Sequence, residues 1–147
     1  GALLPDLLNS LLADPYFRLP PPKSTGREHF NEDWLQQRLP ADANARQVQS
    51  TLAELTARTI ANALNDFAPQ RLLVCGGGTN NQHLLARLHA LLDIPVCSTE
   101  DFGLHPDWVE AGAFAWLAWA RIEGETGNAP AVTGASRAAV LGQLTLP

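Results

Sequence analysis

Three consecutive glycines, Gly76, Gly77 and Gly78, are the residues whose type and spacing best suit ligand chemistry. They follow the apolar residues 72–75 and precede Asn80 and Asn81, where a leucine-spaced segment begins. Glycine has no Cβ and adopts positive φ, so such a turn lets backbone N–H groups approach a bound group at a helix start. The pattern predicts a strand, a tight turn and a helix that together hold a nucleotide.

A plain strand-to-helix turn without a ligand is the alternative for these glycines. The triplet matches neither the spaced dinucleotide fingerprint nor the lysine-bearing phosphate loop. Three glycines in a row cost more backbone entropy than a turn needs, which favours a site that a ligand approaches closely. Asparagine is also a good N-cap, so one of Asn80 and Asn81 is equally well explained as the start of the helix.

Glu110 is the second candidate, because it is a single carboxylate among the small and aromatic residues 110–118. A carboxylate in the first turn of a helix interacts favourably with the helix dipole. A carboxylate facing a cleft also accepts hydrogen bonds from substrate hydroxyls, and Gly112 would let another helix approach closely. The residues alone leave both interpretations open.

Other site chemistries lack support in the sequence. The histidines and cysteines show no zinc-type spacing, since they stand at His29, Cys75, His83, His89, Cys97 and His105. No serine occupies a nucleophile elbow and no close pair of acids is present, which argues against a hydrolase. We therefore expect no structural metal, and we predict a chain that binds rather than completes a reaction.

Composition sets the outer limits. The chain has 147 residues, 46% of them hydrophobic, which suits one domain with a core. Its net charge is −5 without a basic cluster, which argues against nucleic acid as a partner. No apolar run reaches about 18 residues and no basic segment precedes the first leucines, so we expect no membrane span and no signal peptide. A chain that starts at Gly1 and contains no methionine is expected to be an excised piece.

Hydrophobic spacing predicts the elements that would position the candidates. Leucines at helical spacing predict a helix over residues 3–14, followed by an extended proline-rich connector over 16–27. Further helices are predicted over 44–67, from the asparagines at 80–81 with an inner face over 84–92, and from Pro106 to Ile122, with a glycine-rich tail that holds a short helix at 136–141. Strands are predicted at 72–75 and 94–97, which makes a parallel strand–helix–strand crossover.

Burial is predicted from the same patterns. The continuous apolar run at 72–75 is typical of a strand that is covered on both faces. Cys75 and Cys97 are expected to be buried free thiols, as in a cytosolic protein. Trp116 and Trp119 are three residues apart on one predicted helix, which favours ordinary core packing over the alternative, a partner interface.

Four segments together resemble the anhydro-N-acetylmuramic acid kinases. They are residues 21–31 (PPKSTGREHFN), 75–81 (CGGGTNN), 110–118 (EAGAFAWLA), and 126–128 (TGN) with 132–136 (VTGAS). The resemblance runs in order along nearly the whole chain and ends where that family ends. It implies a bacterial, cytoplasmic enzyme of cell-wall recycling that uses ATP and Mg²⁺ to open a 1,6-anhydro sugar with water and phosphorylate O6.

The resemblance also implies a fold and site residues. The expected fold is α/β, a ribonuclease H-like (actin-like ATPase) lobe with a mixed sheet covered by helices. Residues 1–147 would form a single domain, the C-terminal lobe of a two-lobe kinase, with a helix and connector (1–43), a nucleotide-lobe core (44–125) and a tail (126–147). Gly76, Gly77, Gly78 and Asn80 would bind the nucleotide and Glu110 the sugar. Lys23 and Arg27 are weaker candidates.

The sequence departs from the family's pattern in one large respect. It contains neither the first phosphate-binding loop, of the type Gly-Thr-Ser-x-Asp-Gly, nor the catalytic aspartate that activates water. We therefore assign no catalytic residue to this chain and expect it to be inactive without the N-terminal lobe. The implied partners are ATP, the anhydro sugar, that lobe and a second copy in a homodimer. The alternatives are a non-catalytic nucleotide- or sugar-binding module and a dimerisation module derived from the lobe.

Overall fold

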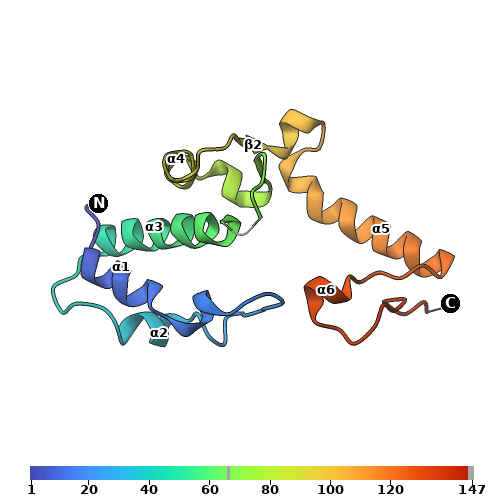
Figure 1. Ribbon diagram of the computed structural model, residues 1–147, viewed down its shortest axis with the longest axis horizontal. Helices are drawn as coiled ribbons and strands as arrows, with labels where there is room; N and C mark the ends of the chain where they lie inside the picture. The colour runs from blue at the N-terminus through green and yellow to red at the C-terminus, as the bar shows by residue number, and fades with distance from the viewer. Residues whose placement is uncertain (66, 146–147) are drawn as a thin grey trace.

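The computed structural model describes residues 1–65 and 67–145, and it begins with a small helical layer. Helix α1 (Pro5–Leu12) packs along α3 (Ala45–Leu64), as Figure 1 shows. The predicted leucine face of α1 is correct, because Leu7, Leu8 and Leu11 are buried against Leu55 of α3. Proline at the first position of α1 suits a helix start, and Asn44 with Gln47 forms a capping box on α3.

The segment between α1 and α3 is more structured than predicted. Residues 15–31, here called the arm, begin with a 3₁₀ turn (Pro15–Arg18) and continue without regular structure to α2 (Glu32–Gln36). Short helix α2 was not predicted. Its five residues give too little periodicity to detect, although Asn31 caps it by accepting a hydrogen bond from the Trp34 N–H at 2.8 Å.

A buried carboxylate joins α3 to α4 (Gln82–Leu91). Glu54 is completely buried, and its carboxylate accepts hydrogen bonds from Arg58 Nε at 2.8 Å and from Arg87 at 2.6 Å and 3.2 Å. The Arg87 hydrogen bond is the main cause that lowers the pKa of Glu54, and it outweighs the opposing effect of burial. This ion-pair group fixes the helix that follows the glycine turn.

The predicted parallel crossover is present, but its burial was predicted wrongly. Strands β1 (Leu72–Val74) and β2 (Val96–Ser98) precede and follow α4 in the chain. They pair with each other in parallel, with Leu73 opposite Cys97. The Leu73 side chain is 42% exposed, and Cys75 is exposed while Cys97 is half-buried. Both thiols are free, as expected, but neither is fully buried. Within the described residues the sheet has two strands, so no further layer covers Leu73.

Helix α5 (Val109–Glu123) leaves the sheet after the 3₁₀ turns Thr99–Phe102 and Pro106–Trp108. In Figure 1 it extends away from α3 toward the C-terminal tail, which lies beside its far end. Trp116 and Trp119 are 50% and 52% exposed, so the predicted core packing of these residues is wrong. Of the α5 side chains only Ala120 is fully buried; Val109 and Leu117 are half-buried and the rest are exposed.

The tail contains a short helix in a different place from the predicted one. Helix α6 covers Pro130–Thr133 and ends at Gly134, whose φ is +73°. Residues 136–141, predicted as helical, are irregular. Their backbone is bonded elsewhere, since Asn128 bonds the Arg137 carbonyl and the Ala139 N–H. As far as the chain is described, no helix is both long enough and apolar enough to cross a membrane.

Candidate functional site

The glycines form a 3₁₀ turn, Gly76–Asn80, at the carboxyl end of β1. Gly76 has a φ of +69°, and its carbonyl oxygen accepts a hydrogen bond from Thr79 Oγ1 at 2.8 Å. A Cβ placed on Gly77 or Gly78 would meet no atom within 4 Å. Only Gly76 therefore needs glycine for its own backbone, and the other two leave free space beside the chain that another group is able to approach.

The two asparagines after the glycines have different places. Asn81 caps α4, because its side chain accepts a hydrogen bond from the Leu84 N–H at 3.0 Å. The expectation that one of the pair is an N-cap is thus confirmed for Asn81. Asn80 lies in the turn itself and lines a polar pocket.

This polar pocket, of about 230 Å³, lies where β1 and β2 end. The turn contributes two residues, and the end of β2 with the chain after it contributes the rest; the lining residues are Thr79, Asn80, Ser98, Glu100, His105, Pro106 and Asp107. The glycine turn packs against the 3₁₀ turn Pro106–Trp108, which closes one side of the pocket. Open α/β sheets bind ligands at the carboxyl ends of their strands, so the pocket is in the expected place for a ligand.

The lining of the polar pocket selects a kind of ligand. Glu100 and Asp107 supply two exposed carboxylates, Asn80 supplies an amide, and no lysine or arginine lines it among the described residues. His105 Nδ1 accepts a hydrogen bond from the Asp107 N–H at 3.3 Å, which fixes the ring at the rim. Carboxylates and amides suit hydroxyl groups and divalent cations, whereas a bare phosphate would be repelled. The pocket therefore fits the hydroxyls of a nucleoside or sugar and a metal-neutralised anion.

The hydroxyl groups after β2 are arranged differently from one another. Ser98 caps the following 3₁₀ turn, since its Oγ accepts a hydrogen bond from the Glu100 N–H at 3.1 Å. The neighbouring Thr99 Oγ1 is buried and has no hydrogen-bond partner among the described residues. A buried hydroxyl without a partner is unfavourable, and Thr99 itself is not a lining residue of the pocket, although Ser98 and Glu100 on either side of it are.

Glu110 is not part of this pocket. It lies in the first turn of α5 with an exposed side chain, three residues beyond Asp107. The structure thus brings Asn80 together with the glycine turn and leaves Glu110 outside. Lys23 and Arg27 lie in the arm, where Lys23 Nζ bonds the carbonyl oxygens of Tyr16 and Phe17 at 3.3 Å and 3.4 Å.

Besides Thr79 in the glycine turn, five lining residues were missed by sequence reasoning: Ser98, Glu100, His105, Pro106 and Asp107. They follow the second strand of the crossover, and the carboxyl ends of parallel strands meet at one edge of a sheet. That rule, applied to the predicted strand at 94–97, would have placed them beside the glycines. Among the described residues no group of three or more histidine, cysteine, aspartate or glutamate side chains is placed to hold a metal ion.

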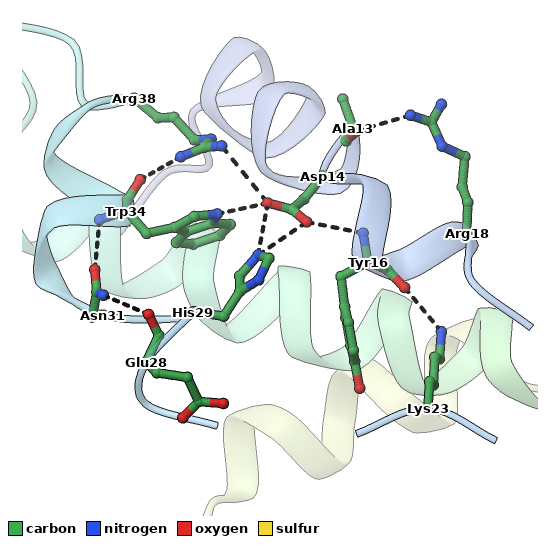
Figure 2. A network of polar contacts seen from close by, with 10 residues as sticks. All are labelled: Ala13, Asp14, Tyr16, Arg18, Lys23, Glu28, His29, Asn31, Trp34 and Arg38. Atoms are coloured by element: carbon green, nitrogen blue, oxygen red, sulfur yellow. Dashed lines mark hydrogen bonds and ion pairs between the residues drawn. The ribbon is translucent and has the colours of Figure 1, made fainter. Parts of the chain in front are cut away.

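A separate polar network anchors the arm, as Figure 2 shows. The carboxylate of Asp14, a residue only 4% exposed, accepts hydrogen bonds from the Tyr16 N–H at 3.0 Å and from Trp34 Nε1 at 2.7 Å. His29 Nε2 lies 3.2 Å from both carboxylate oxygens, and Arg38 Nη2 lies at 3.7 Å. Burial opposes ionisation, but the hydrogen bonds from Trp34, Tyr16 and His29 outweigh it and lower the pKa of Asp14.

Comparison with known proteins agrees with the sequence pattern. The profile of the family described as anhydro-N-acetylmuramic acid kinase matches residues 1–147. Three relatives of that name, from the Dugway, Henzerling II and Nine Mile strains of Coxiella burnetii, are each 47% identical over 148 residues. The match covers 98% of this chain and 40% of each relative. With a family match along its whole length, the chain belongs to the anhydro-N-acetylmuramic acid kinase family.

Proposed function

We propose that the chain is the C-terminal lobe of an ATP-dependent kinase of cell-wall recycling. The complete enzyme opens 1,6-anhydro-N-acetylmuramic acid with water and phosphorylates O6, which gives N-acetylmuramic acid 6-phosphate in the bacterial cytoplasm. Family membership supports this reaction. The observation that carries the role of this chain is the polar pocket at the carboxyl ends of β1 and β2, next to glycines with free space above them.

The polar pocket suits part of a magnesium nucleotide. When bound, Mg-ATP supplies the phosphoryl group and the cation that neutralises it. Gly76, Gly77 and Gly78 would lie along the nucleotide because no residue that the structure describes occupies the space beside the last two. Asn80 would bond a nucleoside hydroxyl, and the two pocket carboxylates would tolerate the nucleotide only with its metal. Glu110, one helical turn beyond the pocket, would accept hydrogen bonds from the sugar.

The remaining parts of the active site lie in the other lobe. A general base contributes about 10²- to 10⁴-fold to a reaction rate, and the aspartate that would play this role is not in the sequence of this chain. Phosphoryl transfer also depends on positioning and on charge stabilisation around the phosphates. The 147 residues alone would therefore bind ligands weakly and would not turn the substrate over.

The exposed apolar residues support a second body that covers this chain. One stripe runs along α5 from its N-cap Trp108, away from buried Ala120; its members recur at steps of four and three and are Trp108, Gly112, Ala115, Trp119 and Ile122. Trp119 and Ile122 are 52% and 70% exposed. Such a continuous apolar stripe marks an interaction surface.

The open sheet points to the same partner. The Leu72 N–H donates a hydrogen bond to the carbonyl of Pro95, the residue before β2. Backbone groups of successive strand residues point to opposite edges, so the N–H and C=O of Leu73 face the free edge of β1. Two parallel strands rarely form a stable sheet unaided. We propose that additional strands of a ribonuclease H-like sheet pair beside β1 and that they come from the part of a family polypeptide outside this chain. A homodimer through the α5 stripe is the second candidate, which its exposed tryptophans favour.

Calorimetric titration with Mg-ATP, and separately with the anhydro sugar, tests the site. Gly77 does not need positive φ, and a Cβ there meets no atom of the described residues within 4 Å, so Gly77→Val should fold normally and block the nucleotide. Ala86→Val, an exposed substitution on α4, is the matched control. Loss of weak nucleotide binding in Gly77→Val alone supports the proposal. Equal binding by both variants would refute a nucleotide site at the glycines.

A further inference from the structure

A second cavity lies between the arm and the C-terminal turns of α3, and the proposed function does not use it. Its volume is about 400 Å³, within the range of small-molecule sites. Six of its lining residues are apolar: Phe17, Leu19, Pro20, Pro21, Ala63 and Phe67. The cavity shares no lining residue with the polar pocket beside the glycine turn. It is called the arm cavity below.

Polar groups are few in the arm cavity, and its charged ones are cations. Thr59 and Asn62 come from α3, and Arg18 and Lys23 come from the arm. Among the described residues, the Arg18 side chain donates a hydrogen bond only to the Ala13 carbonyl oxygen, at 3.2 Å. No carboxylate of the described residues lies within ion-pair distance of Arg18 or Lys23. Two cations without a carboxylate stand out in a chain of net charge −5. They make the rim of the arm cavity attractive to an anion.

The walls of the arm cavity are held in place before any ligand binds. Lys23 bonds two backbone carbonyls and lies over the Tyr16 ring, 5.0 Å from its centroid. The Tyr16 N–H is bonded by buried Asp14, as Figure 2 shows, and the Phe17 ring stacks on Phe30 at 5.3 Å. Ordering these groups therefore costs a ligand little binding free energy. By contrast, Leu19 and Phe67 are 51% and 67% exposed, so apolar surface remains to be covered.

We propose that the arm cavity binds a small organic anion with an apolar body, such as an aromatic or branched-chain carboxylate. The apolar body would cover Phe17, Leu19 and Phe67, and the carboxylate would face Arg18 and Lys23. Asn62 would bond a polar substituent. Because the two cavities share no residue, this proposal does not depend on the nucleotide site, and either one can fail without the other.

The test is titration of the purified ¹⁵N-labelled protein with 2-naphthoate, followed by amide chemical shifts. We expect shifts at Thr59, Asn62 and Ala63, and weaker binding of neutral 2-naphthamide. Lys23→Gln and Arg18→Gln should each weaken 2-naphthoate binding about five- to tenfold, as expected for a partly exposed charge-assisted contact. Lys23→Arg should restore most of it. Arg46→Gln removes the same charge from an exposed site outside the cavity and should change nothing.

Three results would overturn the proposal. Shifts confined to α5 would mean that naphthoate only coats the exposed stripe, and equal affinity for naphthamide would remove the role of the cations. The third concerns a longer polypeptide, in which the part of the Coxiella burnetii relative outside the match is joined to this chain. Loss of naphthoate binding there would show that another protein segment fills the arm cavity. Persistence of the same shifts would support a small-molecule site.

Discussion

Replacing Glu54 with glutamine should destabilise the protein by about 2 kcal/mol, because hydrogen bonds to charged groups contribute about 1.5–3 kcal/mol each. Glutamine keeps the size of the side chain but offers one acceptor oxygen in place of the two that contact Arg58 and Arg87. The cost is limited by the arginine side chains, which are 43% and 34% exposed and are able to turn to water. A fully buried unpaired charge would cost more.

Thermal unfolding followed by circular dichroism measures this effect. For a chain of this size, 2 kcal/mol corresponds to a fall in Tm of roughly 4–8 °C. The pH dependence gives a second readout, because the folded-state pKa of Glu54 lies below the ordinary value of 4.5. The stabilisation is then fully present above pH 4.5 and is lost as the pH falls through the folded-state pKa. Wild type and Glu54→Gln should therefore differ at neutral pH and converge in acid.

Glu123→Gln is the control, because Glu123 is exposed at the end of α5 and contacts neither arginine. It should leave Tm within about 1 °C of wild type, as surface changes usually do. The reasoning fails if Glu54→Gln unfolds like this control at neutral pH. It also fails if the difference between wild type and Glu54→Gln stays constant in acid.

Further predictions concern the arm, α5 and activity. Asp14→Asn should lower stability by about 1–3 kcal/mol at neutral pH and less in acid, since the pKa of Asp14 is lowered too; urea unfolding at both pH values measures this. Joining the remaining length of the Coxiella burnetii relative should shift tryptophan emission to the blue by covering Trp108 and Trp119, which are 67% and 52% exposed, and an unchanged spectrum would contradict the proposed covering. The 147 residues alone should release no ADP from Mg-ATP with the anhydro sugar in a coupled assay, and turnover would disprove their dependence on the other lobe.

Local patterns predicted the elements that depend on neighbouring residues. The leucine spacing of α1, the long α3 and the crossover through α4 follow from periodicity, and all three are correct. The short helix at 136–141 was wrong because Asn128, from another part of the tail, bonds that backbone. Helix α2 was missed because its capping residue, Asn31, is a weak signal alone. The hydrogen bond from Trp34 to Asp14 also holds this helix, but the two residues are 20 positions apart, so local sequence patterns do not show it.

Burial was the part that the sequence could not decide. The pattern of an apolar strand and of a helix with two tryptophans predicts buried side chains. Burial also requires a second element packed against them, and in the described part of the chain Leu73 and Trp119 remain exposed. The glycine turn was predicted from local residue types, whereas Glu100 and Asp107 enter the polar pocket only through the pairing of β1 with β2. Glu54 gave no signal either, because its second arginine is 33 residues away.

The Asp14 network has a consequence for how the arm moves. One carboxylate is the common acceptor for the Tyr16 N–H, the Trp34 indole and His29, which lie on three successive segments of the chain. When the carboxylate leaves, all of its donors lose their partner in the same event. The arm should therefore open as one cooperative unit, and proton exchange at the Tyr16 amide and the Trp34 indole should proceed at a common rate.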